Sequence, residues 1–283
     1  MRSENLILIA DAGSTKTSCC LKSKSCVLKM FTTSGVNPSV QSVDEIEKVF
    51  VEQLLMHIPN VGNVSDIFFY GAGCTPQRSS IVKDVFVNIG FSQTEILIES
   101  DILGAAKAVC GNSPGVVGIL GTGSNSCRYD GEKIVENTPS LGFILGDEGS
   151  GAYIGKRLVS DCLKGILSER LSNIFLKETK LSVPLIIQKV YREPAPNRYL
   201  AGLSRFCVNH LDEQEIIMLL IECFEQFFHR NILRYDNPSG VVHLVGSIAS
   251  AYKEQVVEAA SRCSLRVGRV IKSPIDGLIE NFS

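Results

Sequence analysis

The 283-residue chain has no tryptophan and almost no net charge, and both shortages narrow the functions to be considered. Lys and Arg number 28 against 30 Asp and Glu, a formal net charge of −2, so no overall positive field would attract a polyanion. Aromatic residues make up only 7% of the chain, which supplies few stacking platforms for single strands. We therefore expect no nucleic-acid partner.

Long hydrophobic runs and paired metal-ligand motifs are also missing. The apolar run at 6–10 is too short for a signal peptide, and no run approaches the ~20 residues of a membrane span. The ten cysteines form no C-x-x-C pair and the four histidines form no zinc-type pair. We expect a cytoplasmic protein with no membrane partner and with reduced, mostly buried thiols.

The first half of the chain reads as strands alternating with helices, a pattern typical of α/β domains. Ser42 to Glu45 form a capping box before an apolar helical face, and Ser100 precedes a helix that ends at Gly111. We expect strands at 6–10, 17–21, 26–31, 67–70 and 95–98, and helices at 43–58, 81–89 and 101–110.

The second half begins by repeating the first. Residues 7–14 (ILIADAGS) and 117–124 (VGILGTGS) match, and each segment joins two predicted strands through a glycine loop, so the sequence indicates an internal duplication. Asp130-Gly131 predicts a type I′ turn. We expect strands at 116–120, 125–129, 132–135 and 241–245, helices at 151–166, 185–191, 212–233, 247–264 and from 273, and a proline-rich loop at 193–197.

The two glycine loops are the first candidates for chemistry. The loop at 11–17 is not a P-loop, because Thr15 precedes Lys16 and a strand follows. The loop at 121–124 lacks the dinucleotide fingerprint, because a strand again follows. Either loop alone is more often a plain hairpin, but two such turns in two similar domains favour binding of one polyphosphate by backbone amides and hydroxyls.

Three acidic residues are the second candidates. Asp11 ends a strand beside the first loop, where a carboxylate near phosphates requires Mg²⁺, although it could be a turn residue. Asp101 opens a helix, whose dipole favours the ionised form expected of a general base, although it could be an ordinary N-terminal acid. Asp147 and Glu148 could accept hydrogen bonds from substrate hydroxyls or cap the next helix.

Five segments together resemble the BadF/BadG/BcrA/BcrD ATPase family and, within it, the N-acetylglucosamine kinases. They are ADAGSTKT (10–17), SDILGAA (100–106), LGTGSN (120–125), LGDEGSG (145–151) and LVGSIA (244–249). The resemblance implies an α/β protein with two ribonuclease-H-like domains of the actin/hexokinase/Hsp70 fold and a nucleotide cleft between them. The expected domains are 1–111, with 273–283 as an optional addition, and 112–272.

The resemblance also implies site residues and ligands. Asp101 would be the catalytic base, and Asp11 would hold Mg²⁺. ATP would bind at Gly13, Ser14, Thr15, Lys16, Thr122, Gly123, Ser124, Gly246, Ser247 and Ala249. The sugar would bind at Asn37, Asp101, Gly142 and Asp147. The expected activity is phosphoryl transfer from MgATP to N-acetylglucosamine or a related amino sugar, by a monomer or a homodimer.

Two further comparisons within the family concern the range of sugars used and the alternative function. Animal N-acetylglucosamine kinases carry Trp-Gly-His just before the GDEG motif, where this chain has Leu141-Gly142-Phe143, so we expect broader use of sugars. The same family contains reductase and dehydratase activators, which makes a regulatory ATPase acting on a protein partner the alternative function. Their cysteine motifs have no match here, and iron content would separate the two.

Overall fold

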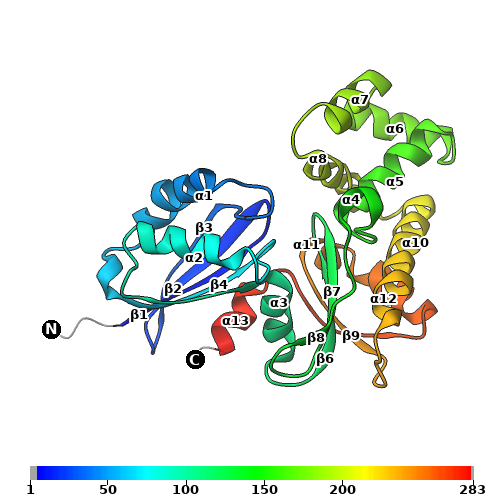
Figure 1. The fold of residues 1–283 in the computed structure, drawn as a ribbon. Coiled ribbons are helices and arrows are strands. Elements are labelled where there is room, and N and C mark those ends of the chain that lie inside the picture. Colours follow the sequence, from blue (N-terminus) through cyan, green and yellow to red (C-terminus); the bar gives the residue numbers. More distant parts are fainter. Residues whose placement is uncertain (1–4, 282–283) are drawn as a thin grey trace. The chain divides into compact units, whose positions relative to one another are not determined.

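The protein is described here from a computed structural model that covers residues 5–281. The chain forms two compact units. Unit 1 contains residues up to Ser113, Gly131–Lys133 and the segment from Ser273, and unit 2 contains Pro114–Asp130 and Ile134–Lys272. Each unit is built around one five-stranded mixed sheet, and Figure 1 shows helices packed beside the strands of each unit.

Unit 1 has the strand order β3-β2-β1-β4-β5. The strands are β1 (Leu6–Ala12), β2 (Lys16–Lys22), β3 (Val27–Ser34), β4 (Val64–Gly71) and β5 (Glu95–Ser100). Strand β2 pairs antiparallel with both β1 and β3. Strand β4 pairs parallel with β1, and β5 pairs parallel with β4. This mixed arrangement follows from short turns between the first three strands and from helical crossovers before β4 and β5.

Helices cover the sheet of unit 1. They are α1 (Val43–Val49), extended by π-helical and 3₁₀ turns at Phe50–Leu54 and Leu55–His57, a 3₁₀ turn at Val61–Asn63, α2 (Ser79–Asn88), α3 (Asp101–Cys110) and α13 (Ile275–Asn281). A buried core joins strand residues such as Leu8 and Phe69 to Phe50 and Phe86 of the first two helical segments. The predicted capping box is present, with the Ser42 hydroxyl accepting from the Glu45 amide.

Unit 2 has the strand order β10-β9-β6-β7-β8. The strands are β6 (Gly115–Leu120), β7 (Ser124–Tyr129), β8 (Ile134–Glu136), β9 (Val241–Val245) and β10 (Arg266–Ile271). The pairs β6·β7 and β7·β8 are antiparallel, and β6·β9 and β9·β10 are parallel. Both units therefore share an antiparallel three-strand start and a parallel continuation, which is the order that the internal repeat predicted.

Helices form most of unit 2. They are α4 (Gly142–Leu145), α5 (Gly151–Leu163), α6 (Glu169–Thr179), α7 (Val183–Tyr191), α8 (Pro196–Leu203), α9 (Arg205–Asn209), α10 (Gln214–Arg230), a 3₁₀ turn at Ile232–Arg234, α11 (Ser247–Ala251) and α12 (Lys253–Arg262). The core joins α10 residues such as Phe224 and Phe227 to β6 and β9.

Several details of the predicted elements were wrong. Tyr129 pairs with Ile134, so four residues connect β7 to β8 and the predicted type I′ turn at Asp130-Gly131 is absent. Next to this pair, Arg128 is paired with Glu136 and its side chain donates to the Glu136 carboxylate. The sequence analysis missed β10, α4, α6, α8 and α9. Pro196, predicted in a loop, opens α8 at a position that suits proline. The helix predicted at 247–264 is split at Tyr252 into α11 and α12.

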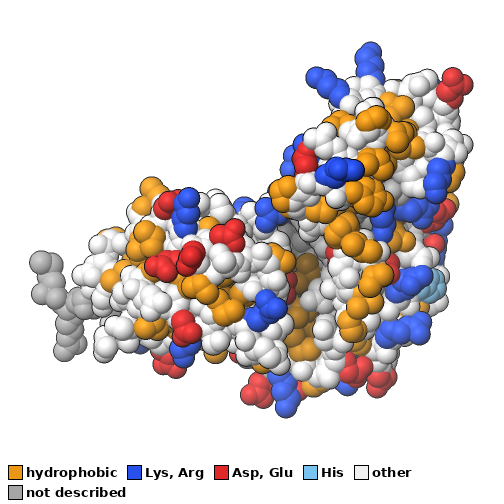
Figure 2. All heavy atoms as spheres, turned by 45° about the horizontal axis from the view of Figure 1, so that its top comes forward, with side chains coloured by type: hydrophobic (Ala, Val, Ile, Leu, Met, Phe, Trp, Pro, Cys, Tyr) orange, Lys and Arg blue, Asp and Glu red, His pale blue; other side chains and the backbone are white. Residues whose placement is uncertain are grey.

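The surface charges and the cysteines of the structure can be compared with the composition of the sequence. On the face that Figure 2 shows, basic and acidic side chains are interspersed, as a net charge of −2 would lead one to expect. Eight of the ten cysteines are buried. In the part of the chain that the structure describes, no helix is both long and apolar enough to cross a membrane.

Candidate active site

Two carboxylates lie at the carboxyl ends of the parallel strands in unit 1. Asp11 is the second-last residue of β1, and Asp101 opens α3 directly after β5. In the parallel pairing, Gly71 of β4 is opposite both Ala12 and Ser100, so the carboxyl ends of the three strands are aligned. The structure thus brings together the two acids that the sequence analysis singled out for the metal and for the base.

Burial controls the protonation of both acids. It raises the pKa of Asp101 to about 6, although the Ile102 amide donates to its Oδ1 at 2.8 Å and opposes the rise. The sequence analysis considered the helix dipole, which favours the ionised form, and did not include this loss of hydration. Burial and the like charge of Asp101 raise the pKa of Asp11 to about 7.

A serine that the sequence analysis missed contacts Asp11. The Ser273 hydroxyl donates to Oδ2 of Asp11 at 3.3 Å, and with the charge of Lys16 it opposes the rise in the Asp11 pKa. Ser273 begins the segment in which the chain returns to unit 1. No motif marks it, because 262 positions separate the two residues in the sequence.

The first glycine loop is held from both sides. The Gly13 amide donates to the Lys16 carbonyl at 3.0 Å, and the Thr15 carbonyl accepts from the Gly35 amide at 3.1 Å. A Cβ atom on Gly35 would lie 2.4 Å from the Gly13 carbonyl oxygen, so only glycine fits there. Thr15 and Lys16 remain exposed, which leaves them accessible to an anion.

Asn37 contacts the same loop. Its Nδ2 donates to the Ser14 hydroxyl at 2.9 Å, and its Oδ1 accepts from the Ser39 amide at 2.9 Å. The Gln41 side chain accepts from the Asn37 amide at 2.6 Å. The structure therefore places a residue predicted to bind the sugar against a residue predicted to bind phosphate.

The second glycine loop, in unit 2, is bound to the start of α5. The Gly121 amide donates to the Gly123 carbonyl at 2.9 Å and closes the turn. The carbonyls of Gly121 and Thr122 accept from the first two amides of α5, at 2.9 and 3.1 Å. These amides are therefore satisfied by the loop, and an anion would have to bind the loop's own amides and the Thr122 hydroxyl.

Asp147 supports this loop instead of capping the helix. Its Oδ1 accepts from the Ser124 amide at 3.1 Å, and both carboxyl oxygens lie close to Gly123. Burial raises the Asp147 pKa. The cap of α5 is Ser150, whose hydroxyl accepts from the Tyr153 amide at 3.1 Å, so the helix-cap alternative for Asp147 was wrong.

The remaining predicted residues of unit 2 lie in two places. Gly246 has φ +123°, and a Cβ atom there would lie 2.2 Å from the Leu120 carbonyl oxygen, so this segment packs against the end of β6. Ser247 is exposed, whereas Ala249 is fully buried and its methyl group belongs to the core. Gly142, with φ +71°, opens the short helix α4.

Several known proteins are similar to this chain. No family model matches the chain. A protein of Porphyromonas gingivalis provisionally named N-acetylglucosamine kinase has a solved structure with 42% identity and a TM-score of 0.93, over 97% of this chain and 98% of that one. A curated N-acetylmuramic acid/N-acetylglucosamine kinase of Clostridium acetobutylicum is 26% identical over 182 residues, 61% of this chain. That match spans only 58% of the relative's length.

More distant structures show the fold alone. A second protein provisionally named N-acetylglucosamine kinase, from Chromobacterium violaceum, has 19% identity and a TM-score of 0.77, over 99% of this chain and all of that one. A ROK family glucokinase from Streptomyces griseus, solved with glucose and AMPPNP, has 11% identity and a TM-score of 0.54, over 98% of each chain. The predicted α/β fold of the actin/hexokinase type is confirmed.

Proposed function

Because the chain belongs to the N-acetylglucosamine kinase family, we propose that it transfers the γ-phosphoryl group of ATP to a hydroxyl of N-acetylglucosamine or a related amino sugar. The observation that carries this proposal is that Asp11 and Asp101 both lie at the carboxyl ends of the parallel strands of unit 1. Phosphoryl transfer needs mainly positioning and charge stabilisation, and one metal carboxylate, one base and two phosphate loops provide for both.

Asp101 acts as the base in this proposal. It accepts the proton from the attacking sugar hydroxyl as the new oxygen–phosphorus bond forms. A pKa of about 6 leaves most Asp101 side chains ionised at pH 7 while keeping them basic enough to accept a proton. Asn37 and Asp101 hold the sugar on unit 1, and Gly142 and Asp147 contribute from unit 2.

Asp11 is the residue proposed to hold Mg²⁺. Two observations fit a cation here: the carboxylate oxygens are the donors that Mg²⁺ prefers, and the like charge of Asp101 makes the ionised form costly without a counterion. Mg²⁺, when bound, would neutralise charge on the phosphates of ATP. The chain's own contribution is to fix this carboxylate through Ser273.

ATP is proposed to bind both glycine loops. Gly13, Ser14, Thr15 and Lys16 would contact its outer phosphates, and Thr122, Gly123 and Ser124 would contact the middle one. The segment Gly246 to Ala249 would lie under the adenosine, with Ala249 contributing its backbone because its side chain is in the core.

Two broader assignments go with this function. The five motifs support membership of the BadF/BadG/BcrA/BcrD ATPases, with units 1 and 2 as the two ribonuclease-H-like domains. Ten cysteines with no C-x-x-C pair, eight of them buried, support a reducing compartment such as the cytoplasm.

A coupled assay of ADP release tests the function. Amino sugars and neutral hexoses are screened as acceptors with the wild-type chain, with Asp101→Asn, and with Asp84→Asn as a control at an exposed acid of the same unit. We expect sugar-dependent ADP release that Asp101→Asn reduces strongly and the control does not. ADP release that no sugar stimulates would refute the kinase and indicate the regulatory ATPase instead.

A further inference from the structure

A turn at residues 37–41 precedes α1 in unit 1. The Asn37 carbonyl accepts from the amides of Val40 and Gln41, at 3.2 and 3.1 Å, and closes the turn. The next residue, Ser42, is the cap of α1, and this helix is packed into the core of the unit. Gln41 therefore lies between the turn that carries Asn37 and a helix with a fixed place.

The Gln41 side chain contacts the turn through both of its polar atoms. Its Oε1 accepts from the Asn37 amide at 2.6 Å, and its Nε2 donates to the Gly35 carbonyl at 3.2 Å. Gly35 is itself fixed, because its amide donates to the Thr15 carbonyl of the first glycine loop. One uncharged side chain thus bridges the backbone of Gly35 and that of Asn37, and the function proposed above gives it no role.

The place of the Asn37 backbone determines what its side chain can reach. The Asn37 Nδ2 donates to the Ser14 hydroxyl and its Oδ1 accepts from the Ser39 amide, both at 2.9 Å. A side-chain amide has two N–H groups and its oxygen has two lone pairs, so it can also donate to and accept from a sugar hydroxyl. Gly73 restricts the side chain from behind, since a Cβ atom there would lie 2.1 Å from the Asn37 Oδ1.

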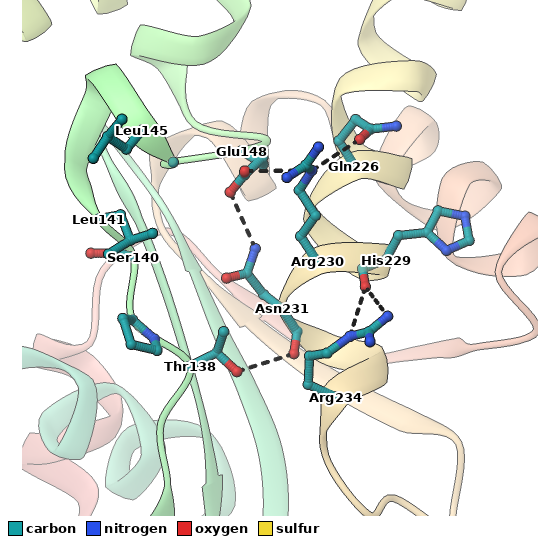
Figure 3. A pocket seen from close by; sticks show the side chains of 12 residues that line it. Thr138, Ser140, Leu141, Leu145, Glu148, Gln226, His229, Arg230, Asn231 and Arg234 are labelled. Carbon is teal, nitrogen blue, oxygen red and sulfur yellow. Dashed lines mark hydrogen bonds and ion pairs between the residues drawn. The ribbon is translucent and has the colours of Figure 1, made fainter.

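The acid of unit 2 that the sequence analysis also considered for sugar hydroxyls is held less closely. Figure 3 shows Glu148 with its contacts to Asn231 and Arg230, which measure 3.5 and 3.7 Å. Hydrogen bonds from N–H groups to oxygen usually measure about 2.7–3.2 Å, so both contacts are long. The contact of 2.6 Å between Gln41 and Asn37 is short by the same standard and fixes its partner more firmly.

We propose that Gln41 is a positioning residue for the sugar: it fixes the backbone of Asn37 so that the Asn37 side chain meets a sugar hydroxyl, and it does not touch the sugar itself. This rests on the proposed function and adds a residue to it. Without the Gln41 amide, binding of the sugar would have to order the turn, which costs affinity. The proposed base, Asp101, lies on another element, so turnover of bound sugar should change less than affinity.

Steady-state rates of ADP release test this proposal on the full chain. ATP is saturating, and the varied acceptor is the amino sugar that the screen above finds to be the best. The variants are Gln41→Met, which has a similar length and no amide, and Gln41→Glu, which keeps an acceptor for the Asn37 amide. Gln93→Met is the matched control, at an exposed glutamine in the turn before β5. Each change is made in the wild type and in Asn37→Ala.

We expect Gln41→Met to raise the KM for the sugar roughly tenfold, as the loss of about one hydrogen bond would, and to change kcat less than about threefold. Gln41→Glu should raise the KM less, and Gln93→Met should leave it unchanged. In the Asn37→Ala background neither change at Gln41 should raise the KM further, because the side chain to be positioned is gone. This comparison between backgrounds separates positioning from a general loss of structure, and Gln41→Glu provides it if Gln41→Met does not fold.

Two results with an active wild type would overturn the role of Gln41 alone. One is a KM for Gln41→Met within about twofold of the wild type, which is less than one hydrogen bond supplies. The other is a rise in KM of the same size in the Asn37→Ala background as in the wild type. A wild type whose ADP release no sugar stimulates would overturn the proposed function and, with it, this role.

Discussion

Replacing Asp11 by Asn should stabilise the ligand-free protein at neutral and alkaline pH, although the change removes a residue proposed for the active site. The reason is the cost of ionising this carboxyl group in the folded chain. Its pKa rises from 3.8 to about 7, or roughly 3 units, and at ~1.4 kcal/mol per unit the cost reaches about 4 kcal/mol when the group is fully ionised.

The sign of the pH dependence follows from the raised pKa. Between pH 4 and 7 the folded chain holds a proton at Asp11 that the unfolded chain has released, so the stability of the wild type falls as pH rises through this window. The cost is about 1.6 kcal/mol at pH 5 and about 4 kcal/mol at pH 8. Asn cannot ionise, so the variant lacks this contribution, and its advantage should grow by roughly 2.5 kcal/mol between these two pH values.

Urea unfolding measures the effect. Because the chain has no tryptophan, the transition is followed by far-ultraviolet circular dichroism, at pH 5 and pH 8, with EDTA and without nucleotide. Asp84→Asn, at an exposed acid of α2, is the matched control and should change stability little at either pH. An Asp11→Asn variant that is no more stable than the wild type at pH 8, or whose advantage does not change with pH, would refute the reasoning.

Four other outcomes are expected. Asp101→Asn should lower kcat by roughly 10² to 10⁴ while binding of a fluorescent ATP analogue is kept; a loss of less than tenfold would contradict its role as base. The kcat of the wild type should fall about tenfold per pH unit below pH 6, where Asp101 becomes protonated, as initial rates across pH would show. Gly246→Ala should destabilise the chain by at least 1–3 kcal/mol in urea unfolding, because of its φ of +123° and the nearby Leu120 carbonyl. Leu141 should permit broader use of sugars, and strict selectivity for N-acetylglucosamine at millimolar concentrations would contradict this.

Local signals predicted much of the fold. The caps at Ser42 and Ser100 are present because a serine hydroxyl satisfies a helix amide within three residues. The two glycine loops were located correctly, each between antiparallel strands, because the strand patterns and the turn residues are adjacent in sequence. The repeat between the halves then indicated the shared strand order of the two sheets.

Features that depend on distant partners were not predictable. All six residues of β10 are exposed or partly exposed, so its sequence lacks a buried-strand pattern and its place is set by pairing with β9. The role of Asp147 was open in the sequence because the Ser124 amide that it binds lies 23 positions away. The raised pKa of Asp101 was not predicted because burial is a property of the folded chain.

The hydrogen bond between Asn37 and Ser14 has a consequence for how each ligand changes the affinity for the other. It joins the residue proposed for the sugar to the loop proposed for ATP at a distance of 2.9 Å. The Ser14 oxygen accepts from Asn37, and its own proton can be donated to a phosphate, so one side-chain contact links the two ligands. Thermodynamic reciprocity then requires that the factor by which the sugar changes the affinity for ATP equals the factor by which ATP changes the affinity for the sugar.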